Sequence, residues 1–181
     1  MIVMKFGGTS MGNPDAINRC VDLVEREIKR TGKQPLIVVS AYSKGTDKLL
    51  DAAKKAVKGD IEGPFNEVAR RHRDILKGLD LPADIGEGNL TELLDLLRGI
   101  HMVKEVTPRL YDYVASFGER LSSKSFAALL RKRGHANAEA INAYDLGFMT
   151  DSRFMNARPL PDTLEKIGEE NRTDAGQFLV P

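Results

Sequence analysis

The sequence predicts an α/β protein with a mostly parallel sheet and a helical insertion. A strand pattern over residues 1–6 is followed by a helical pattern over 14–31 and a second strand pattern over 35–41. Two strands joined through one helix form a right-handed crossover, so these strands should be parallel. The second run, PLIVVSA, is almost continuously apolar, which is typical of a strand buried on both faces. Residues 65–134 are mainly helical in pattern.

The composition limits the classes of function. With 181 residues, 41% hydrophobic and 29% charged, the chain has the size and balance of about one globular domain. The chain carries nearly equal numbers of basic and acidic residues, Lys+Arg 27 against Asp+Glu 26. Such a balance provides no overall positive field that would attract nucleic acid or an anionic membrane, and neither partner is expected. No apolar run approaches the ~20 residues of a membrane span, and no signal peptide is recognisable. The one cysteine, Cys20, favours a reducing, cytoplasmic setting.

The first dozen residues are typical of a phosphate cradle. Residues 1–6 form an apolar strand that carries one charge, Lys5, and the strand ends at Gly7 and Gly8. Hydroxyl residues follow as far as Ser10, and then a helix begins. Glycines let backbone N–H groups approach an anion, the helix N-terminus adds positive potential, and the lysine supplies a point charge. The stretch matches neither the P-loop nor the dinucleotide fingerprint, and an ordinary strand-turn-helix connection stays open.

The helix predicted over residues 14–31 has clear boundaries. Asn13 can cap it, Pro14 suits its first position, and Gly32 can end it. Its apolar stripe has helical spacing: Ile17, Val21, Val24 and Ile28. Since parallel strands end at one edge of a sheet, residues 5–8 and 40–43 should meet there, where α/β sheets bind ligands.

A loop rich in hydroxyl groups follows the second strand. Thr46 is predicted to cap a helix that runs to about Lys58. The loop containing Ser40 suits a small polar substrate, and a simple capping loop is the alternative.

Residues 65–134 contain several helical patterns but no metal signature. In the first of them, residues 65–77, His72 stands between two arginines, which indicates a solvated charged face rather than a metal or nucleic-acid site. The chain's histidines are scattered, so no metal ligands are predicted. A second helix is predicted over 90–106, and Thr107-Pro108 is a helix-start signal for a third.

Glu119 is the ambiguous residue of the third helix. The tripeptide Gly118-Glu119-Arg120 is predicted to interrupt or kink that helix. Glu119 could pair with Arg120 or Lys124, or it could point into the site and accept a substrate ammonium group, and spacing leaves both open.

The last part of the chain carries weaker signals. A strand of small residues is predicted over 135–143, a turn over 145–147, a short helix over 161–169 and a buried strand from residue 177 onward. There is no internal repeat and no convincing linker.

Four ordered motifs resemble those of the aspartokinases in the amino acid kinase family. They are VMKFGGTS (3–10), VVSAYSKGTDKLL (38–50), SFGERLSS (116–123) and TDSRFMNA (150–157). The resemblance spans residues 1–181 and implies the N-terminal part of a three-layer αβα, carbamate kinase-like domain. It implies ATP-dependent phosphorylation of the L-aspartate β-carboxylate to 4-phospho-L-aspartate, with Mg²⁺, at the start of lysine, threonine and methionine biosynthesis.

The resemblance also assigns roles to residues. Lys5 matches the lysine that contacts the transferred phosphate, and Glu119 matches the acidic residue that engages aspartate, through its amino group. Arg120 is expected to be structural first, and Met155 stands where glycine is usual. The phosphate-binding set is Lys5, Phe6, Gly7, Gly8 and Ser10. The set around aspartate is Ser40, Thr46 and Glu119, flanked by Thr150, Asp151 and Phe154.

The family's GRGGSD segment, its adenine-site residues and its ACT regulatory domains are not in this sequence. The kinase domain is therefore expected to be incomplete, with an apolar strand edge at its end that favours a homo-oligomer or pairing with a C-terminal portion. The alternatives are a catalytically inactive fragment, a binding or assembly module with the kinase fold, and another amino acid kinase.

Overall fold

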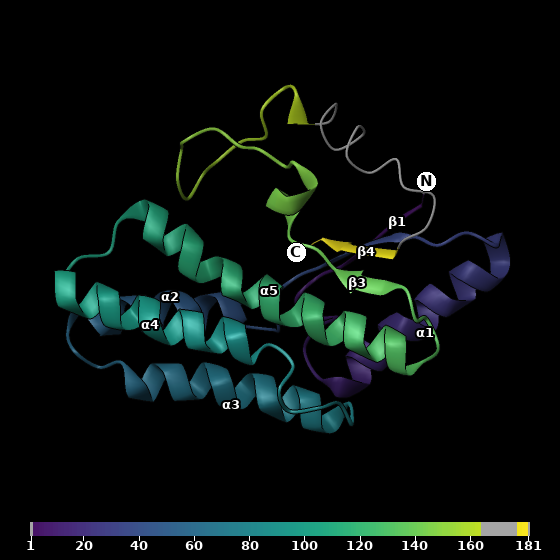
Figure 1. Ribbon diagram of the computed structural model, residues 1–181, viewed down its shortest axis with the longest axis horizontal. Helices are drawn as coiled ribbons and strands as arrows, with labels where there is room; N and C mark the ends of the chain where they lie inside the picture. The colour runs from purple at the N-terminus through teal and green to yellow at the C-terminus, as the bar shows by residue number, and fades with distance from the viewer. Residues whose placement is uncertain (1, 164–176, 181) are drawn as a thin grey trace.

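The computed structural model describes residues 2–163 and 177–180 of the chain (Figure 1). Their strands are β1 (Val3–Phe6), β2 (Leu36–Val39), β3 (Ala138–Ala140) and β4 (Gln177–Val180). Their helices are α1 (Pro14–Thr31), α2 (Gly45–Val57), α3 (Glu62–Gly78), α4 (Glu87–Val103), α5 (Pro108–Lys132) and the 3-10 turn η1 (Ala143–Leu146).

The four strands form one parallel sheet in the order β1-β2-β4-β3. Phe6 at the end of β1 is in register with Val39 at the end of β2, so the loops that follow the two strands begin at the same edge of the sheet. This confirms the predicted parallel pairing. The strand predicted from residue 177 exists, but β4 lies between β2 and β3 instead of at an edge. Among the described strands, the edges are β1 and β3.

The helices pack on one face of this sheet (Figure 1). On that face Phe6 stacks on Phe126 of α5, with ring centroids 5.7 Å apart, and Ile37 and Val39 are buried. On the other face Val3 is 56% exposed. The prediction that the second strand is buried on both faces therefore holds for only one face of β2, while the α/β class with a parallel sheet is confirmed.

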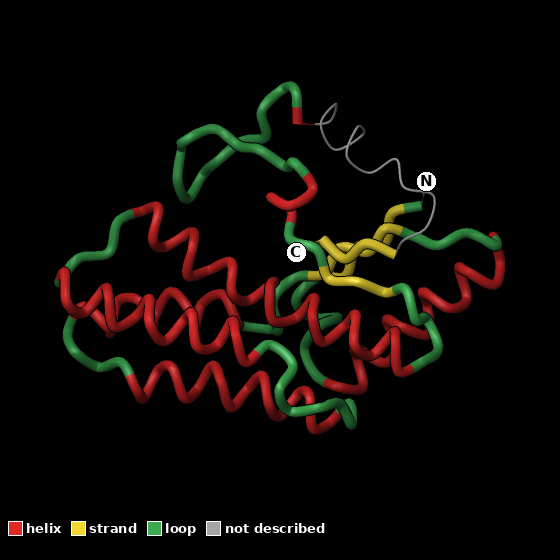
Figure 2. Tube along the Cα trace, viewed as in Figure 1, coloured by secondary structure: helices red, strands yellow, loops and turns green. Residues whose placement is uncertain are grey.

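Helices α2 to α5 form the helical layer that extends away from the sheet, as predicted for residues 65–134 (Figure 2). The boundaries of α1 agree with the prediction. The Asn13 side chain accepts a hydrogen bond from Ala16 N at 2.9 Å, and Gly32 ends the helix with φ 66. Thr107 caps α5 by accepting from Leu110 N at 3.3 Å.

Helix α5 runs unbroken through Gly118, so the predicted kink is wrong. The glycine instead allows a close approach: a Cβ added there would lie 2.7 Å from the Ala41 Cβ, in the loop after β2. Of the helix predicted over 161–169, residues 164–169 lie outside the described residues. No helix in the described part of the chain is long and apolar enough to cross a membrane.

Candidate functional site

The loops that follow β1 and β2 meet at the carboxyl edge of the sheet. Ser40 N donates to the Phe6 carbonyl at 3.0 Å, and a Cβ added to Gly8 would lie 4.0 Å from Ser40 Oγ. Gly8, Ser40 and Thr46 line one open pocket of about 260 Å³. The structure therefore brings together residues from both predicted halves of the site.

The turn after β1 (residues 7–12, the glycine turn) leaves backbone donors available. Met11 N donates to the Gly7 carbonyl at 3.1 Å, which closes the turn. Within residues 2–163 and 177–180, the N–H groups of Gly8, Thr9 and Ser10 donate to no protein acceptor. Three successive N–H groups without internal partners at a glycine turn suit the oxygens of a phosphate.

Lys5 and Phe6 lie on opposite faces of β1. Lys5 is exposed, and among the described residues it forms no ion pair. The Phe6 side chain is buried against Phe126, so only its backbone faces the site, where its carbonyl already accepts from Ser40. Lys5 is therefore a cation without an ion pair among the described residues, two positions before the glycine turn, and the side chain of Phe6 belongs to the core.

The loop over residues 40–46, called here the 40–46 loop, differs locally from the prediction. Helix α2 begins at Gly45, and the residue before it, Lys44, is left-handed with φ 60 and provides no side-chain cap. Thr46 therefore lies inside the first turn and is not the cap, because the turn that Gly45 N closes on the Tyr42 carbonyl at 2.6 Å starts the helix earlier. Among the described residues, the hydroxyls of Ser40 and Thr46 form no hydrogen bond, and both line the pocket.

Glu119 faces this loop from α5. Its Oε1 accepts from Ala41 N at 3.1 Å, and one turn further along the helix Ser122 Oγ donates to the Ser40 carbonyl at 2.8 Å. Burial raises the pKa of the Glu119 carboxyl above its ordinary value, and the bond from Ala41 opposes that rise. In the described part of the chain Glu119 forms no ion pair with Arg120 or Lys124, and its carboxylate binds the loop after β2 instead. Its role as acceptor for a substrate ammonium group stays a prediction.

Arg120 is held by the protein itself. Its Nη2 donates to Glu92 Oε2 at 2.5 Å, and its guanidinium lies 4.4 Å from the centre of the Phe117 ring. It is 9% exposed, which agrees with a structural role. Arg120 and Glu119 also line a second pocket of about 250 Å³, closed on its far side by Asn142 and Tyr144.

Some residues of the site were not predicted. His72 is 1% exposed and not solvated as predicted, whereas Arg73 pairs with Glu87 at the surface at 2.8 Å. Arg71 Nη2 donates to the Gly12 carbonyl at 2.6 Å and so holds the glycine turn. The signal for Ser122 was its three-residue spacing from Glu119, which places both on one face of a helix. No group of three metal-ligating side chains occurs in the described part of the chain.

The segment that contains Asp151 folds on itself beside α5. The Asp151 Oδ1 accepts from the backbone N–H groups of Arg153 and Arg158, each at 3.1 Å. Met155 N donates to Asp112 of α5 at 2.7 Å, and Met155 is left-handed with φ 65. The position at which the resemblance expects glycine therefore has the backbone conformation that glycine favours.

Residues 1–171 match the amino acid kinase family model. Over 172 residues the chain is 34% identical to aspartokinase 2, chloroplastic, of Arabidopsis thaliana, covering 92% of this chain and 31% of that protein. The structure is similar to E. coli aspartokinase III in complex with lysine and aspartate (TM-score 0.81, 26% identity, 99% of this chain and 40% of that one). It is also similar to the same enzyme in complex with aspartate and ADP (TM-score 0.77, 25% identity, 99% and 40%).

The chain therefore belongs to the amino acid kinase family. Within that family, the relatives that it resembles in both sequence and structure are aspartokinases. It spans 31% of the length of the Arabidopsis relative, so these matches concern the part of an aspartokinase that carries the motifs described above.

Proposed function

We propose that this chain is part of an aspartate kinase, which transfers a phosphoryl group from ATP to the β-carboxylate of L-aspartate and forms 4-phospho-L-aspartate. The observation that carries the proposal is the meeting of three groups at one sheet edge. These are the open N–H groups of the glycine turn, the free hydroxyls of the 40–46 loop and the half-buried carboxylate of Glu119. An anion cradle beside a pocket lined by hydroxyls, with the Glu119 carboxylate bonded to the loop that lines this pocket, suits a phosphate donor and a small amino acid.

In this proposal each group has one task. Lys5 and the N–H groups of Gly8 to Ser10 stabilise the negative charge that spreads over the transferred phosphoryl group. Glu119 binds the α-ammonium group of aspartate, since its Oε2 is not used by Ala41. Ser40 and Thr46 orient the β-carboxylate, whose oxygen forms the new bond to phosphorus. MgATP supplies the phosphoryl group, and Mg²⁺ would be held chiefly by phosphate oxygens, given the absence of a metal-ligating cluster among the described residues.

The relatives add support for the substrates, because aspartokinase III was solved with aspartate and ADP. With this activity the protein would catalyse the first step towards lysine, threonine and methionine. We further propose a homo-oligomer or pairing with a C-terminal portion. A cytoplasmic location is proposed as well. The Arabidopsis relatives are named chloroplastic, so cell fractionation is needed to test the location.

The test is a coupled assay of ADP release with L-aspartate, on this chain alone and together with the rest of a kinase domain. Lys5→Ala should lower kcat by about 100- to 1000-fold, the usual cost of removing a donor that stabilises transition-state charge. The matched control is Lys33→Ala, an exposed lysine before β2 at the opposite end of the sheet, which should keep full activity. Undiminished turnover in Lys5→Ala would remove Lys5 from the mechanism.

A second candidate is a binding or assembly module with the kinase fold. Such a module would bind L-aspartate or ATP in calorimetry without turnover, even when the rest of a kinase domain is supplied. Turnover with glutamate or carbamate but not with aspartate would identify another amino acid kinase.

A further inference from the structure

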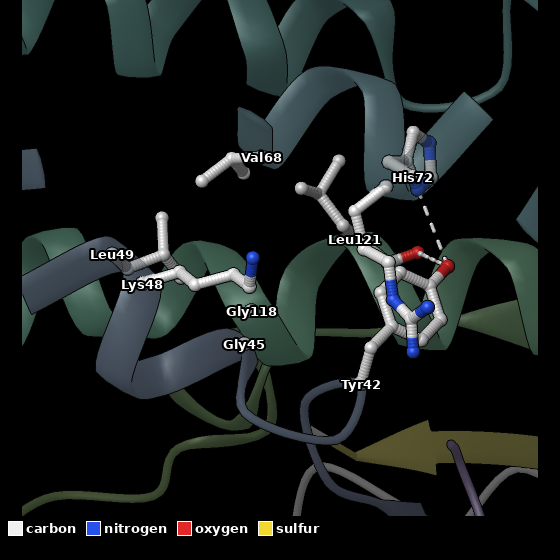
Figure 3. A pocket seen from close by; sticks show the side chains of 9 residues that line it. Tyr42, Gly45, Lys48, Leu49, Val68, His72, Gly118 and Leu121 are labelled. Atoms are coloured by element: carbon white, nitrogen blue, oxygen red, sulfur yellow. Dashed lines mark hydrogen bonds between the residues drawn. The ribbon is translucent and has the colours of Figure 1, made fainter. Parts of the chain in front are cut away.

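The side chain of Tyr42 extends from the 40–46 loop into the helical layer, where it is 5% exposed. Its hydroxyl lies 2.7 Å from Ser125 Oγ of α5, 3.2 Å from His72 Nδ1 of α3 and 3.5 Å from the Leu121 carbonyl. Figure 3 shows the ring of Tyr42 rising from the loop towards His72 and Leu121. The loop is thus anchored to two helices through one hydroxyl.

The donor and the acceptor of each hydrogen bond in this network can be assigned by starting from the Ile85 carbonyl. His72 Nε2 lies 2.7 Å from the Ile85 carbonyl, which can only accept, so Nε2 carries the proton of the neutral ring. Nδ1 is then an acceptor, and the only hydroxyl that reaches it among the described residues is that of Tyr42. Ser125 can donate back to Tyr42 or to the Leu121 carbonyl at 3.1 Å. Each polar side-chain atom of this network, from the imidazole of His72 through the Tyr42 hydroxyl to the Ser125 hydroxyl, therefore has a partner.

The surroundings keep His72 neutral. Burial lowers the pKa of its imidazole below the ordinary value, and the positive charges of Arg73 on α3 and Lys124 on α5 act in the same direction. The bond to Ile85 and the charge of Glu87 on α4 act in the opposite direction. Burial likewise raises the pKa of Tyr42, so its proton is retained.

Three successive residues of the loop are held by one stripe of α5. Ser122 binds the Ser40 carbonyl, Glu119 binds Ala41 N, and Ser125 binds the Tyr42 hydroxyl. Beside Tyr42 lies a small, partly open cavity of about 20 Å³, lined by apolar side chains that include Leu49 and Leu121 and also by His72 (Figure 3). Because packing is incomplete at this point, the hydrogen bonds of Tyr42 carry more of the task of fixing the loop.

We propose that Tyr42, His72 and Ser125 are positioning residues that fix the 40–46 loop in the conformation in which Ser40 and Thr46 bind the amino-acid substrate. The identity of that substrate as L-aspartate rests on the proposed function. Because the glycine turn has a further anchor of its own, the bond from Arg71 to the Gly12 carbonyl, we expect the network to act chiefly on the amino-acid half of the site.

The kinetic test uses three variants of the network and two control variants. Tyr42→Phe and His72→Leu break the network and should raise KM for L-aspartate about tenfold, because each leaves buried partners unpaired. His72→Gln retains one donor and one acceptor and should keep KM within about twofold of the original protein. In all of them, KM for MgATP and kcat should change less than about threefold. The matched controls are Tyr111→Phe on α5 and His101→Gln on α4, which should leave both KM values unchanged.

A pH profile separates positioning from a merely structural role. Protonated His72 donates from both nitrogens and cannot accept from Tyr42. Because burial lowers the pKa of His72, KM for aspartate should stay level near neutral pH and rise only as the pH falls below the ordinary histidine pKa of about 6.5. His72→Gln cannot titrate at position 72, whereas Glu119 titrates in both proteins. The ratio of KM for aspartate in the unaltered protein to KM for aspartate in His72→Gln, followed against pH, therefore reports the protonation of His72 alone. A constant ratio, or a KM for aspartate that Tyr42→Phe leaves unchanged, overturns the proposal. If Tyr42→Phe and His72→Leu do not fold, the pH dependence of the KM ratio between the unaltered protein and His72→Gln decides the test.

A third measurement does not depend on catalysis. The backbone amide signals of Ser40 and Ala41 in a ¹H–¹⁵N correlation spectrum should shift in the Tyr42→Phe variant. In the His72→Gln variant the same signals should keep the positions that they have in the unaltered protein. If these shifts occur while aspartate is not phosphorylated, the proposed function fails and the network stands. If the loop amides do not respond, the network fails whatever the activity.

Discussion

Replacing Gly118 with alanine tests whether α5 must touch the loop after β2. The new Cβ would lie 2.7 Å from the Ala41 Cβ and 3.3 Å from Leu49 Cδ1. Carbon atoms prefer a separation of about 3.5–4.0 Å, so the helix or the loop must move by about 1 Å. Such overpacking costs about 1–3 kcal/mol, and the better helix propensity of alanine returns about 1 kcal/mol. We expect a net loss of about 1 kcal/mol in the free energy of unfolding.

The control is Gly99→Ala in α4, where an added Cβ meets nothing within 4 Å. This variant keeps only the propensity gain and should be more stable by about 1 kcal/mol. The difference of about 2 kcal/mol between the two variants, measured by urea denaturation, is the steric cost alone. Equal stability of the two variants would refute the close approach of α5 to the loop. Gly118→Ala should also raise KM for aspartate, because the movement separates Glu119 from Ala41 N.

Two further changes test the site and one helix end. Glu119→Gln keeps an acceptor for Ala41 N but loses the charge, so KM for aspartate should rise at least about tenfold with KM for MgATP unchanged; a parallel rise in both would contradict a specific role. In the unaltered protein, the raised pKa of Glu119 means that aspartate affinity falls as the pH drops through that pKa, and Glu119→Gln should lose this dependence. Gly32→Ala should cost about 1 kcal/mol in thermal or urea unfolding, because Gly32 has φ 66 and alanine is strained there; an unchanged stability would contradict the left-handed end of α1.

The elements with strong local signals could be predicted from the sequence. Asn13, Pro14 and Gly32 define α1 because capping and backbone preference act within a few residues. The meeting of the glycine turn with the 40–46 loop was predictable as well, since parallel strands with a right-handed crossover leave no other arrangement.

What depends on distant contacts could not be predicted. Gly118 reads locally as a helix breaker, and only the position of Ala41 shows that it is needed for a close approach. The two arginines next to His72 suggest a solvated face, whereas the ring is buried and Arg71 lines the same small cavity. The direction of the Glu119 carboxylate was likewise fixed by a backbone N–H group 78 positions away in the sequence.

The position of β4 has a consequence for how the sheet is made. Strands β2 and β3 do not pair with each other, and Leu179 of β4 is in register with Ile37 on one side and Ala140 on the other. A ribosome delivers β1, β2 and β3 well before β4, so the nascent chain carries two unpaired strand edges until β4 is made and inserts between them. During that interval another nascent copy could supply the missing strand, so slow synthesis between β3 and β4 should increase misassembly.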